Sequence, residues 1–241
     1  MNKSIATALL LLPAIAQAET RLPAGYTEVA CIVVTNAEQY IDTGFEPGYI
    51  TDIEARFAVP DFSQDNILYW TRARDLSSFA FITKAGGADT TKTKKVRAYR
   101  YSPGESQIET EIPDYLTETE IAYSTKHVDN KTDNTFTVNG QTVDFVAATW
   151  TSVIPNIFLF RLNNAGSLYS GVKAVVGMKL YSFKIIEGDA AKMDFVPCLR
   201  NSDSAAGLYD TVGNAFYANA GSGGSFGYEA KKGPGFVIVI K

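Results

Sequence analysis

The sequence predicts an all-β protein, an antiparallel two-sheet β-sandwich. Between Tyr26 and Glu187 the apolar residues show no sustained 3.6-residue period, so long amphipathic helices are not expected. Short runs rich in Val, Ile, Thr, Tyr and Phe are instead separated by Gly, Pro, Asn and Asp. Many short strands with turn signals between them are typical of an antiparallel sandwich. The content of 46% hydrophobic and 20% charged residues excludes a disordered or membrane-embedded chain.

The clearest pair of strands is the hairpin around Asn139-Gly140, which suits a two-residue type I′ turn. Its register places Phe136 opposite Val143 and Thr137 opposite Thr142, which gives one apolar and one polar face. Polar loops are expected between strands, and Ala218–Phe226 has the composition of a flexible Gly/Ser stretch. Strands are expected over residues 26–34, 39–43, 50–58, 65–72, 78–84, 95–101, 107–112, 117–127, 134–138, 141–146, 156–161, 172–186, 193–197 and 236–240.

The two ends of the chain predict an export signal and a tail. Residues 1–18 combine a short positive start, an apolar stretch over Ile5–Ile15 and the small-x-small site Ala16-Gln17-Ala18. This pattern predicts a signal peptide cleaved after Ala18, and so a periplasmic, cell-surface or extracellular protein. No later apolar run approaches the roughly 20 residues of a membrane span. We expect one sandwich domain over 19–228 and a tail over 229–241, in which Phe236–Ile240 has the composition of a final strand.

The charge of the chain argues against nucleic acid as a partner. Removal of Lys3 with the signal peptide takes the 22 basic residues to 21, against 26 acidic ones, for a net charge of −5. Phosphate binding requires a basic face, which this balance does not favour.

Two blocks near opposite ends of the chain carry a resemblance to known proteins. The first is LPAGYTEVACIVVTNAEQYIDTGF (22–45), and the second is the longer closing block over 177–226, which contains KMDFVPCLRNSDSAAGLYDTVGNAFY. Together they resemble secreted and phage-associated modules with a concanavalin A-like (laminin-G-like) fold. The resemblance implies a jelly-roll β-sandwich, and it implies architecture more than activity. The sequence departs from this group at Tyr69-Trp70-Thr71, where Phe-Gly-Ala is more usual. Residues 86–123 also have no counterpart in the group.

The two cysteines, Cys31 and Cys198, lie one in each block. Two cysteines of an exported chain can pair, and the resemblance implies that the first and last strands lie side by side. A disulfide closing so long a loop would stabilise by up to about 5 kcal/mol in the chain-entropy model. The alternative is two buried free thiols, and the sequence leaves both alternatives open.

No catalytic pattern stands in the sequence. Glucanases with this fold use an E-x-D-x-x-E strand that places two carboxylates at one cleft, and the sequence lacks it. His127 is the only histidine and lies in a polar stretch, which excludes most nucleophilic triads and zinc sites. We therefore do not expect an enzyme, with a glycoside hydrolase as a distant third hypothesis. Three i, i+2 acidic pairs are interpreted as solvated strand faces: Asp52 and Glu54, Glu109 and Glu111, and Glu118 and Glu120.

Calcium is the one cofactor that the sequence suggests, and only weakly. Asp129 and Asp133 offer hard oxygens within Asp129–Asn134. The EF-hand pattern fails because Lys131 and Gly140 stand at ligand positions, so a polar turn is the preferred interpretation. A weaker second set, better explained as turn formers, is Asn201, Asp203 and Asp210.

The densest aromatic and arginine cluster is the candidate ligand site: Trp70, Arg72, Arg74, Tyr99 and Tyr101. Sugar rings pack on aromatic faces with arginine neighbours, although most aromatics of a sandwich fill its core. Strand alternation leaves either Tyr69 or Trp70 facing inward, not both outward.

Two hypotheses follow from these observations. The first is an exported, non-catalytic, lectin-like module that binds glycan or a cell-surface partner. The second is a structural or adhesion sandwich that acts through protein contacts. A groove lined by Trp70, Arg72 and Tyr99 would favour the first, and a flat apolar patch or a free final strand would favour the second.

Overall fold

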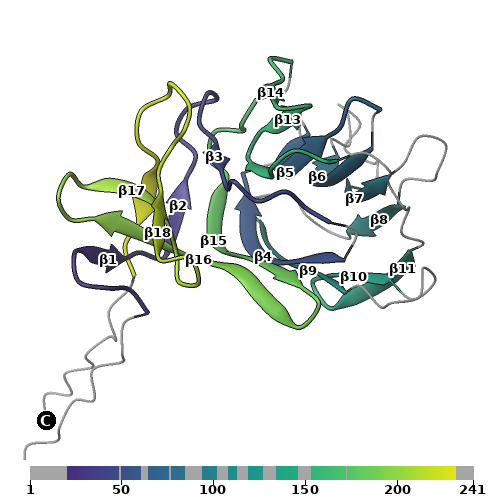
Figure 1. Cartoon of the computed structure of the whole chain (residues 1–241), viewed down its shortest axis with the longest axis horizontal. Helices are drawn as coiled ribbons and strands as arrows, with labels where there is room; N and C mark the ends of the chain where they lie inside the picture. The colour runs from purple at the N-terminus through teal and green to yellow at the C-terminus, as the bar shows by residue number, and fades with distance from the viewer. Residues whose placement is uncertain are drawn as a thin grey trace, which may run out of the picture.

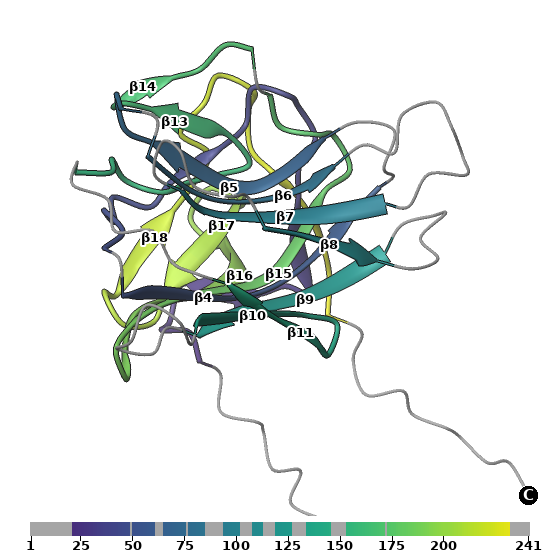
Figure 2. The same ribbon diagram turned by 90° about the vertical axis from the view of Figure 1, so that its right-hand side faces the viewer.

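The computed structural model describes residues 21–48, 50–60, 65–75, 77–84, 94–101, 108–112, 119–126, 134–145, 153–171 and 173–231. Within these ranges the chain forms strands and connecting turns, packed as two sheets face to face (Figures 1 and 2). The all-β prediction is thereby confirmed. In the same ranges no helix is long and apolar enough to cross a membrane.

The first sheet contains most of the described strands that lie near the two ends of the chain. Its main path is β11 (Gln141–Phe145), β10 (Asn134–Val138), β9 (Thr119–Lys126), β4 (Thr51–Val59), β15 (Lys179–Glu187), β16 (Ala190–Arg200), β17 (Ala205–Asp210) and β18 (Ala215–Tyr217). In addition, β1 (Tyr26–Glu28) pairs with β16, and β2 (Cys31–Val33) pairs with β15 and with β19 (Gly227–Glu229).

The second sheet faces the first and carries the candidate ligand site. Its path is β14 (Ser167–Leu168), β13 (Leu162–Asn164), β5 (Asn66–Arg72), β6 (Ser78–Lys84), β7 (Lys94–Tyr101) and β8 (Ile108–Ile112). A short strand, β12 (Phe158–Leu159), pairs with both β5 and β3 (Ile41–Asp42). Every described pair is antiparallel except β13 with β5, which is parallel.

The core lies between the two sheets and is rich in aromatic rings. Phe57 of β4 meets Phe81 of β6 edge-on, with ring centroids 5.6 Å apart. Tyr69 of β5 similarly meets Phe183 of β15 at 5.8 Å. These contacts join one sheet to the other, as expected of a sandwich in which alternate residues of each strand face inward.

The predicted hairpin is confirmed in detail. Asn139 and Gly140 both adopt positive φ, as a type I′ turn requires. Phe136 pairs with Val143, and Thr137 pairs with Thr142, with their hydroxyl oxygens 2.9 Å apart. Phe136 is fully buried, so the apolar face of the hairpin is the one that packs on the core.

The two ends of the described chain lie side by side (Figure 1). Strand boundaries differ from the prediction here, because residues 26–34 form two strands with different partners: β1 pairs with β16, whereas β2 pairs with β15 and β19. The predicted strand over 172–186 begins only at Lys179, and β17, β18 and β19 were not predicted. The predicted signal peptide, 1–18, and final strand, 236–240, lie outside the described residues.

The Gly/Ser stretch is hydrogen-bonded to the opening block, which corrects its interpretation as a flexible segment. The buried Gln39 Nε2 donates to Ser225 O at 2.7 Å, and its Oε1 accepts from Thr35 N at 2.7 Å. Asn219 Oδ1 accepts from Tyr40 N at 3.0 Å. A Cβ added at Gly221 would overlap the carbonyl oxygen of Glu38, so the lack of a side chain at Gly221 allows the two backbone segments to lie this close together. We call the contact between residues 35–40 and 219–225 the closing region.

Of the two alternatives for the cysteines, a disulfide or two free thiols, the structure has the free thiols. Cys31 and Cys198 are both buried free thiols. Cys31 lies opposite Glu229 of β19, whereas Cys198 lies between Glu28 of β1 and Gly207 of β17. The two thiols thus lie opposite different residues of different strands. Burial raises the pKa of Cys31 to about 11 and that of Cys198 to about 12.

Candidate functional site

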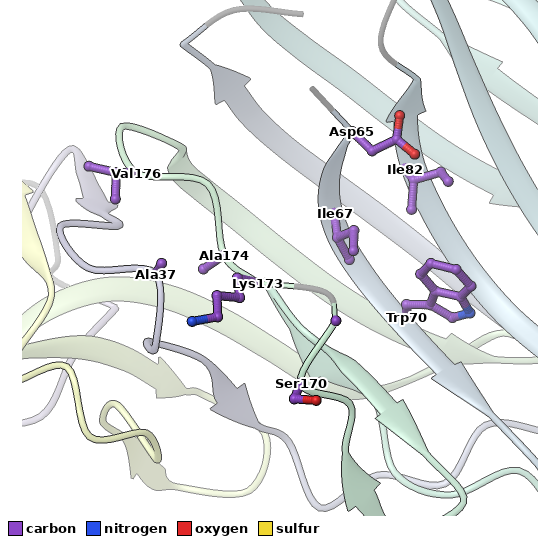
Figure 3. A pocket seen from close by; sticks show the side chains of 10 residues that line it. Ala37, Asp65, Ile67, Trp70, Ile82, Ser170, Lys173, Ala174 and Val176 are labelled. Carbon is purple, nitrogen blue, oxygen red and sulfur yellow. The ribbon is translucent and has the colours of Figure 1, made fainter. Parts of the chain in front are cut away.

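A cleft of about 590 Å³ opens beside β5 on the second sheet. One wall is formed by strand residues, Ile67 and Trp70 of β5 and Ile82 of β6, and the other by loop residues (Figure 3). Its size falls within the usual range of small-ligand sites. The remaining lining residues are Ala37, Asp65, Ser170, Gly171, Lys173, Ala174 and Val176.

Strand alternation explains why Trp70 reaches this cleft. Tyr69 faces the core and is only 1% exposed, so its neighbour Trp70 turns to the opposite face of the sheet. There it packs on Ile67, Ala80 and Ile82, a small apolar cluster separate from the main core. Trp70 remains partly exposed. The prediction that only one of Tyr69 and Trp70 faces outward is therefore confirmed.

Arg72 extends the same face beyond the cleft. It lies two residues after Trp70, so both side chains leave β5 on the same side, about 7 Å apart along the strand. Arg72 Nε donates to Asn164 Oδ1 at 3.0 Å, and its guanidinium carbon lies 5.9 Å from the centroid of the Tyr169 ring. We call Arg72 and Tyr169 the platform.

Two ion pairs of Glu38 hold the loop wall of the cleft together. Glu38 accepts from Arg161 at 3.0 Å and from Lys173 at 2.6 Å, and Ala174 N donates to Ala37 O at 3.2 Å. The hydrogen bond from Lys173, followed by that from Arg161, holds the pKa of Glu38 below its usual range. This network joins the segment around Ala37 to the segment around Lys173, and both segments line the cleft.

The buried Arg161 owes its position to a sharp reversal of the chain. Phe160 has φ of +68°, a conformation unusual for a bulky residue, and its N–H donates to Leu68 O. Leu159 pairs with β5 in the antiparallel sense, yet Leu162 pairs with the same strand in the parallel sense. The reversal between them places Arg161, of which only 4% of the side chain is exposed, against Ala37 and Glu38.

The structure brings together part of the predicted ligand cluster. Trp70 pairs with Ala80 and Ala80 with Tyr99, while Arg72 pairs with Ser78 and Ser78 with Tyr101. The four cluster residues therefore occupy two adjacent rows of one sheet, although the side chains of β7 are not among those that the structure describes. Arg74 is placed elsewhere: it follows the end of β5 and lines a separate hollow with Glu46, Val153 and Pro155.

The calcium candidates divide into two groups. Asp129 and Asp133 lie outside the described residues, and within the described ranges no group of three His, Cys, Asp or Glu residues is placed to hold a metal. Asp203 and Asp210 form turns, as the sequence suggested. Asp203 accepts from Ala205 N, and the buried Asp210 accepts from the backbone N–H groups of Asp194, Val212 and Gly213.

One acidic pair differs from expectation. Glu54 is exposed, as a solvated strand face requires, but Asp52 is only 7% exposed. Asp52 Oδ1 accepts from the Thr125 hydroxyl, which in turn accepts from Ile53 N, so the neighbouring strand covers this carboxylate. The other two acidic pairs have no described side chains.

Several residues of the site were missed by sequence reasoning. Asp65, Lys173 and Tyr169 stand in segments interpreted as strand starts or loops. Asp65 directly precedes β5, and Lys173 is held at the site by its ion pair with Glu38. Tyr169 reaches the site because β13 and β14 fold back beside β5, a pairing that contains the one described parallel contact. The only local signal is Asn164-Ala165-Gly166, where Ala165 and Gly166 adopt positive φ in a tight turn.

No protein-family model matches the chain, and no curated protein matches it. Among solved structures, the chain is similar to the Ruminococcus gnavus IT-sialidase CBM40 bound to α2,3 sialyllactose, at 12% identity, TM-score 0.45, over 69% of this chain and 93% of that one. It is similar to the heptameric SAP-like pentraxin from Limulus polyphemus, at 8% identity, TM-score 0.48, over 66% and 75%. It is also similar to domains LG4-5 of the mouse laminin α1 chain, at 12% identity, TM-score 0.42, over 77% and 48%.

Proposed function

We propose that this protein is a non-catalytic carbohydrate-binding module whose ligand packs against Trp70 in the cleft. The observation that supports this is a partly exposed indole in a cleft of about 590 Å³, with Asp65, Ser170 and Lys173 on the same lining. A sugar ring presents an apolar face of C–H groups and an equatorial rim of hydroxyls. The aromatic wall suits the first, and the carboxylate, hydroxyl and ammonium groups suit the second.

The composition of the lining favours binding over hydrolysis. Glycoside hydrolysis requires two carboxyl groups that flank the scissile bond. Asp65 is the only carboxylate among the described residues that line the cleft. Lys173 is held by Glu38 and supplies a fixed positive charge, not a second acid.

The test is a glycan array that carries neutral, galactosylated, sialylated and uronic-acid-containing oligosaccharides, probed with and without calcium. We expect specific binding that falls at least tenfold in Trp70→Ala and partly recovers in Trp70→Phe, because the loss reflects the aromatic wall. The matched control is Tyr228→Ala, which removes a half-exposed ring outside the cleft and should bind as the unmodified protein does. Equal binding by Trp70→Ala would reject the cleft as the site.

A second candidate is adhesion through protein contact. Two exposed apolar side chains favour it, Leu168 on β14 and Val176 at the cleft. Two results together would favour this function. A folded sample should bind no glycan on the array, and it should show concentration-dependent self-association that is lost in Leu168→Ser.

We also propose that the protein is exported from the cell that makes it, after cleavage of residues 1–18. The N-terminal pattern supports a mature protein that begins at Glu19. Mass spectrometry of the protein recovered from the periplasm or medium of the expressing cells would test it, and retention of residues 1–18 on the mature protein would reject it.

A further inference from the structure

Tyr169 stands at the rim of the cleft, held in place by two neighbours. Its ring lies over Arg72, whose guanidinium carbon is 5.9 Å from the ring centroid. The ring also lies close to Gly171, where an added Cβ would be only 2.8 Å from the ring carbon Cε1. The residue is nevertheless 42% exposed. The ring therefore has two neighbours and remains open to solvent, as an aromatic binding surface prepared in advance of its ligand would be.

The platform is anchored to the sheet that carries Trp70. Asn164 pairs with Arg72 across the parallel contact, and its side-chain oxygen receives the Arg72 Nε hydrogen bond. Tyr169 N donates to Leu162 O, and Leu162 pairs with Trp70. The hairpin that carries Tyr169 is thus tied to β5 at the level of both outward-facing residues.

The platform adjoins the cleft without an intervening segment. Ser170 and Gly171, which directly follow Tyr169, line the cleft, and Arg72 follows Trp70 on the same strand face at about 7 Å. Arg72 therefore shares a strand face with the aromatic residue at the cleft and lies beside the aromatic ring at its rim. A guanidinium offers several N–H donors, which suit the hydroxyl and ring oxygens of a sugar chain.

We infer that Arg72 and Tyr169 form a second sugar subsite, so that the ligand is an oligosaccharide with one ring on Trp70 and a further ring on Tyr169. This inference rests on the proposed function of the cleft. A single sugar would occupy the Trp70 position alone, and each unit added toward the platform would gain contact with Tyr169 and Arg72. The affinity should therefore depend on chain length.

The experiment is isothermal titration with an oligosaccharide series of increasing length, prepared from the glycan that binds best on the array. With the unmodified protein, affinity should rise with length and then level off. In Tyr169→Ala the loss should grow with length, to about tenfold for the longest members, which removes the rise. Tyr169→Phe should keep the rise, because the ring and not the hydroxyl provides the stacking surface.

Gly171→Ala provides an independent variant, because its methyl group displaces the Tyr169 ring without deleting it. It should flatten the length dependence as Tyr169→Ala does, while Tyr228→Ala should not. Melting temperatures of all variants confirm that each is folded before titration.

The outcomes separate this inference from the proposed function. A length-independent affinity that still requires Trp70, or a Tyr169→Ala loss that is equal at every length, would overturn the second subsite and leave the cleft proposal standing. Binding that is indifferent to Trp70→Ala would overturn both. A rise with length that Tyr169→Ala and Gly171→Ala both flatten supports both.

Discussion

The closing region and the cleft are both built from short segments, but they differ in what their side chains contact. In the closing region, Gln39 and Asn219 satisfy backbone groups with side-chain amides, and Gly221 lets two backbones come together. In the cleft and platform, Trp70 and Tyr169 keep part of their rings exposed. The first arrangement directs its polar groups at the chain itself, whereas the second leaves surface available to another molecule.

This contrast indicates how the effects of substitution should divide between the two regions. A side chain that pairs with buried backbone groups cannot be removed without leaving those groups unpaired, so its loss lowers stability. An exposed ring that contacts few neighbours can be removed with little effect on folding, so its loss appears in binding. Substitutions in the closing region should therefore destabilise the protein more than substitutions in the platform.

The protection of the two thiols tests whether the terminal part of the fold is closed as described. Cys31 and Cys198 are buried and their thiol pKa values are raised, so the reactive thiolate is scarce at neutral pH. We expect labelling by Ellman's reagent to be at least about 10³-fold slower in the native protein than in denaturant. Without reductant, denatured protein should expose two thiols. Their absence until reductant is added would show a disulfide and contradict the free-thiol arrangement.

Gln39→Leu should cause the largest loss of stability of any substitution in the closing region. The change keeps the side-chain size but leaves Thr35 N, Asn36 N and Ser225 O without their partner. A group left unpaired costs about 1–3 kcal/mol, and the lower end applies here because these bonds are only part-buried. We therefore expect a total loss of about 3 kcal/mol, measured by urea unfolding. Gln141→Leu, the same change at an exposed glutamine of β11, should stay within about 0.5 kcal/mol. Similar losses in both would deny Gln39 a special role.

Gly221→Ala tests the close approach in the closing region. The added methyl group overlaps the carbonyl oxygen of Glu38, so one backbone segment must move. We expect a loss of about 1–3 kcal/mol in the unfolding free energy. Ser222→Ala, at the neighbouring position, is the control and should change little. An unchanged stability in Gly221→Ala would mean that the stretch has no fixed contact with residues 35–40.

Tyr169→Ala should lower stability by no more than about 1 kcal/mol, because the ring is 42% exposed and its neighbours are Arg72, at 5.9 Å from the ring centroid, and Gly171. The matched change in the core, Tyr69→Ala, should cost about 3–5 kcal/mol, since that ring is buried. Thermal and urea unfolding of the two variants measure both values. If the Tyr169 variant proved the less stable of the two, the platform would be a structural element.

The smallest effect concerns the acid dependence of the loop wall. Because Lys173 and Arg161 lower the pKa of Glu38, its carboxylate contributes stability above the usual glutamate range and loses it as the pH falls through the lowered value. The stability difference between the unmodified protein and Glu38→Gln should thus be greatest near neutral pH and shrink in acid. Urea unfolding across this pH range measures it, with Glu54→Gln as the exposed control. A difference that grew in acid would have the wrong sign.

The architecture was predictable because alternation and turn chemistry are local. Phe136, Asn139 and Gly140 specify a hairpin without reference to distant residues, and the register followed directly. The choice between Tyr69 and Trp70 was also correctly narrowed by the two-residue period of a strand. Local patterns therefore predicted the sandwich and the outward position of one aromatic residue.

The rest depends on contacts that no local pattern carries. Gly221 has the composition of a flexible segment, and only the backbone of Glu38 beside it shows that the glycine is required for packing. Tyr169 reaches the site through the reversal at Phe160, where a bulky residue adopts a left-handed conformation. Arg74 follows Arg72 by two residues yet lies beyond the end of the strand, so alternation no longer applied to it.

The pairing of β2 with β19 also has a consequence for the order of folding. Cys31 finds its strand partner in Glu229, so one edge of β2 has no neighbour until almost the whole described chain has been synthesised. Such long-range pairing raises the contact order and slows folding. We expect the nascent chain to remain incomplete, with an unprotected strand edge near its beginning, until its last described strand arrives.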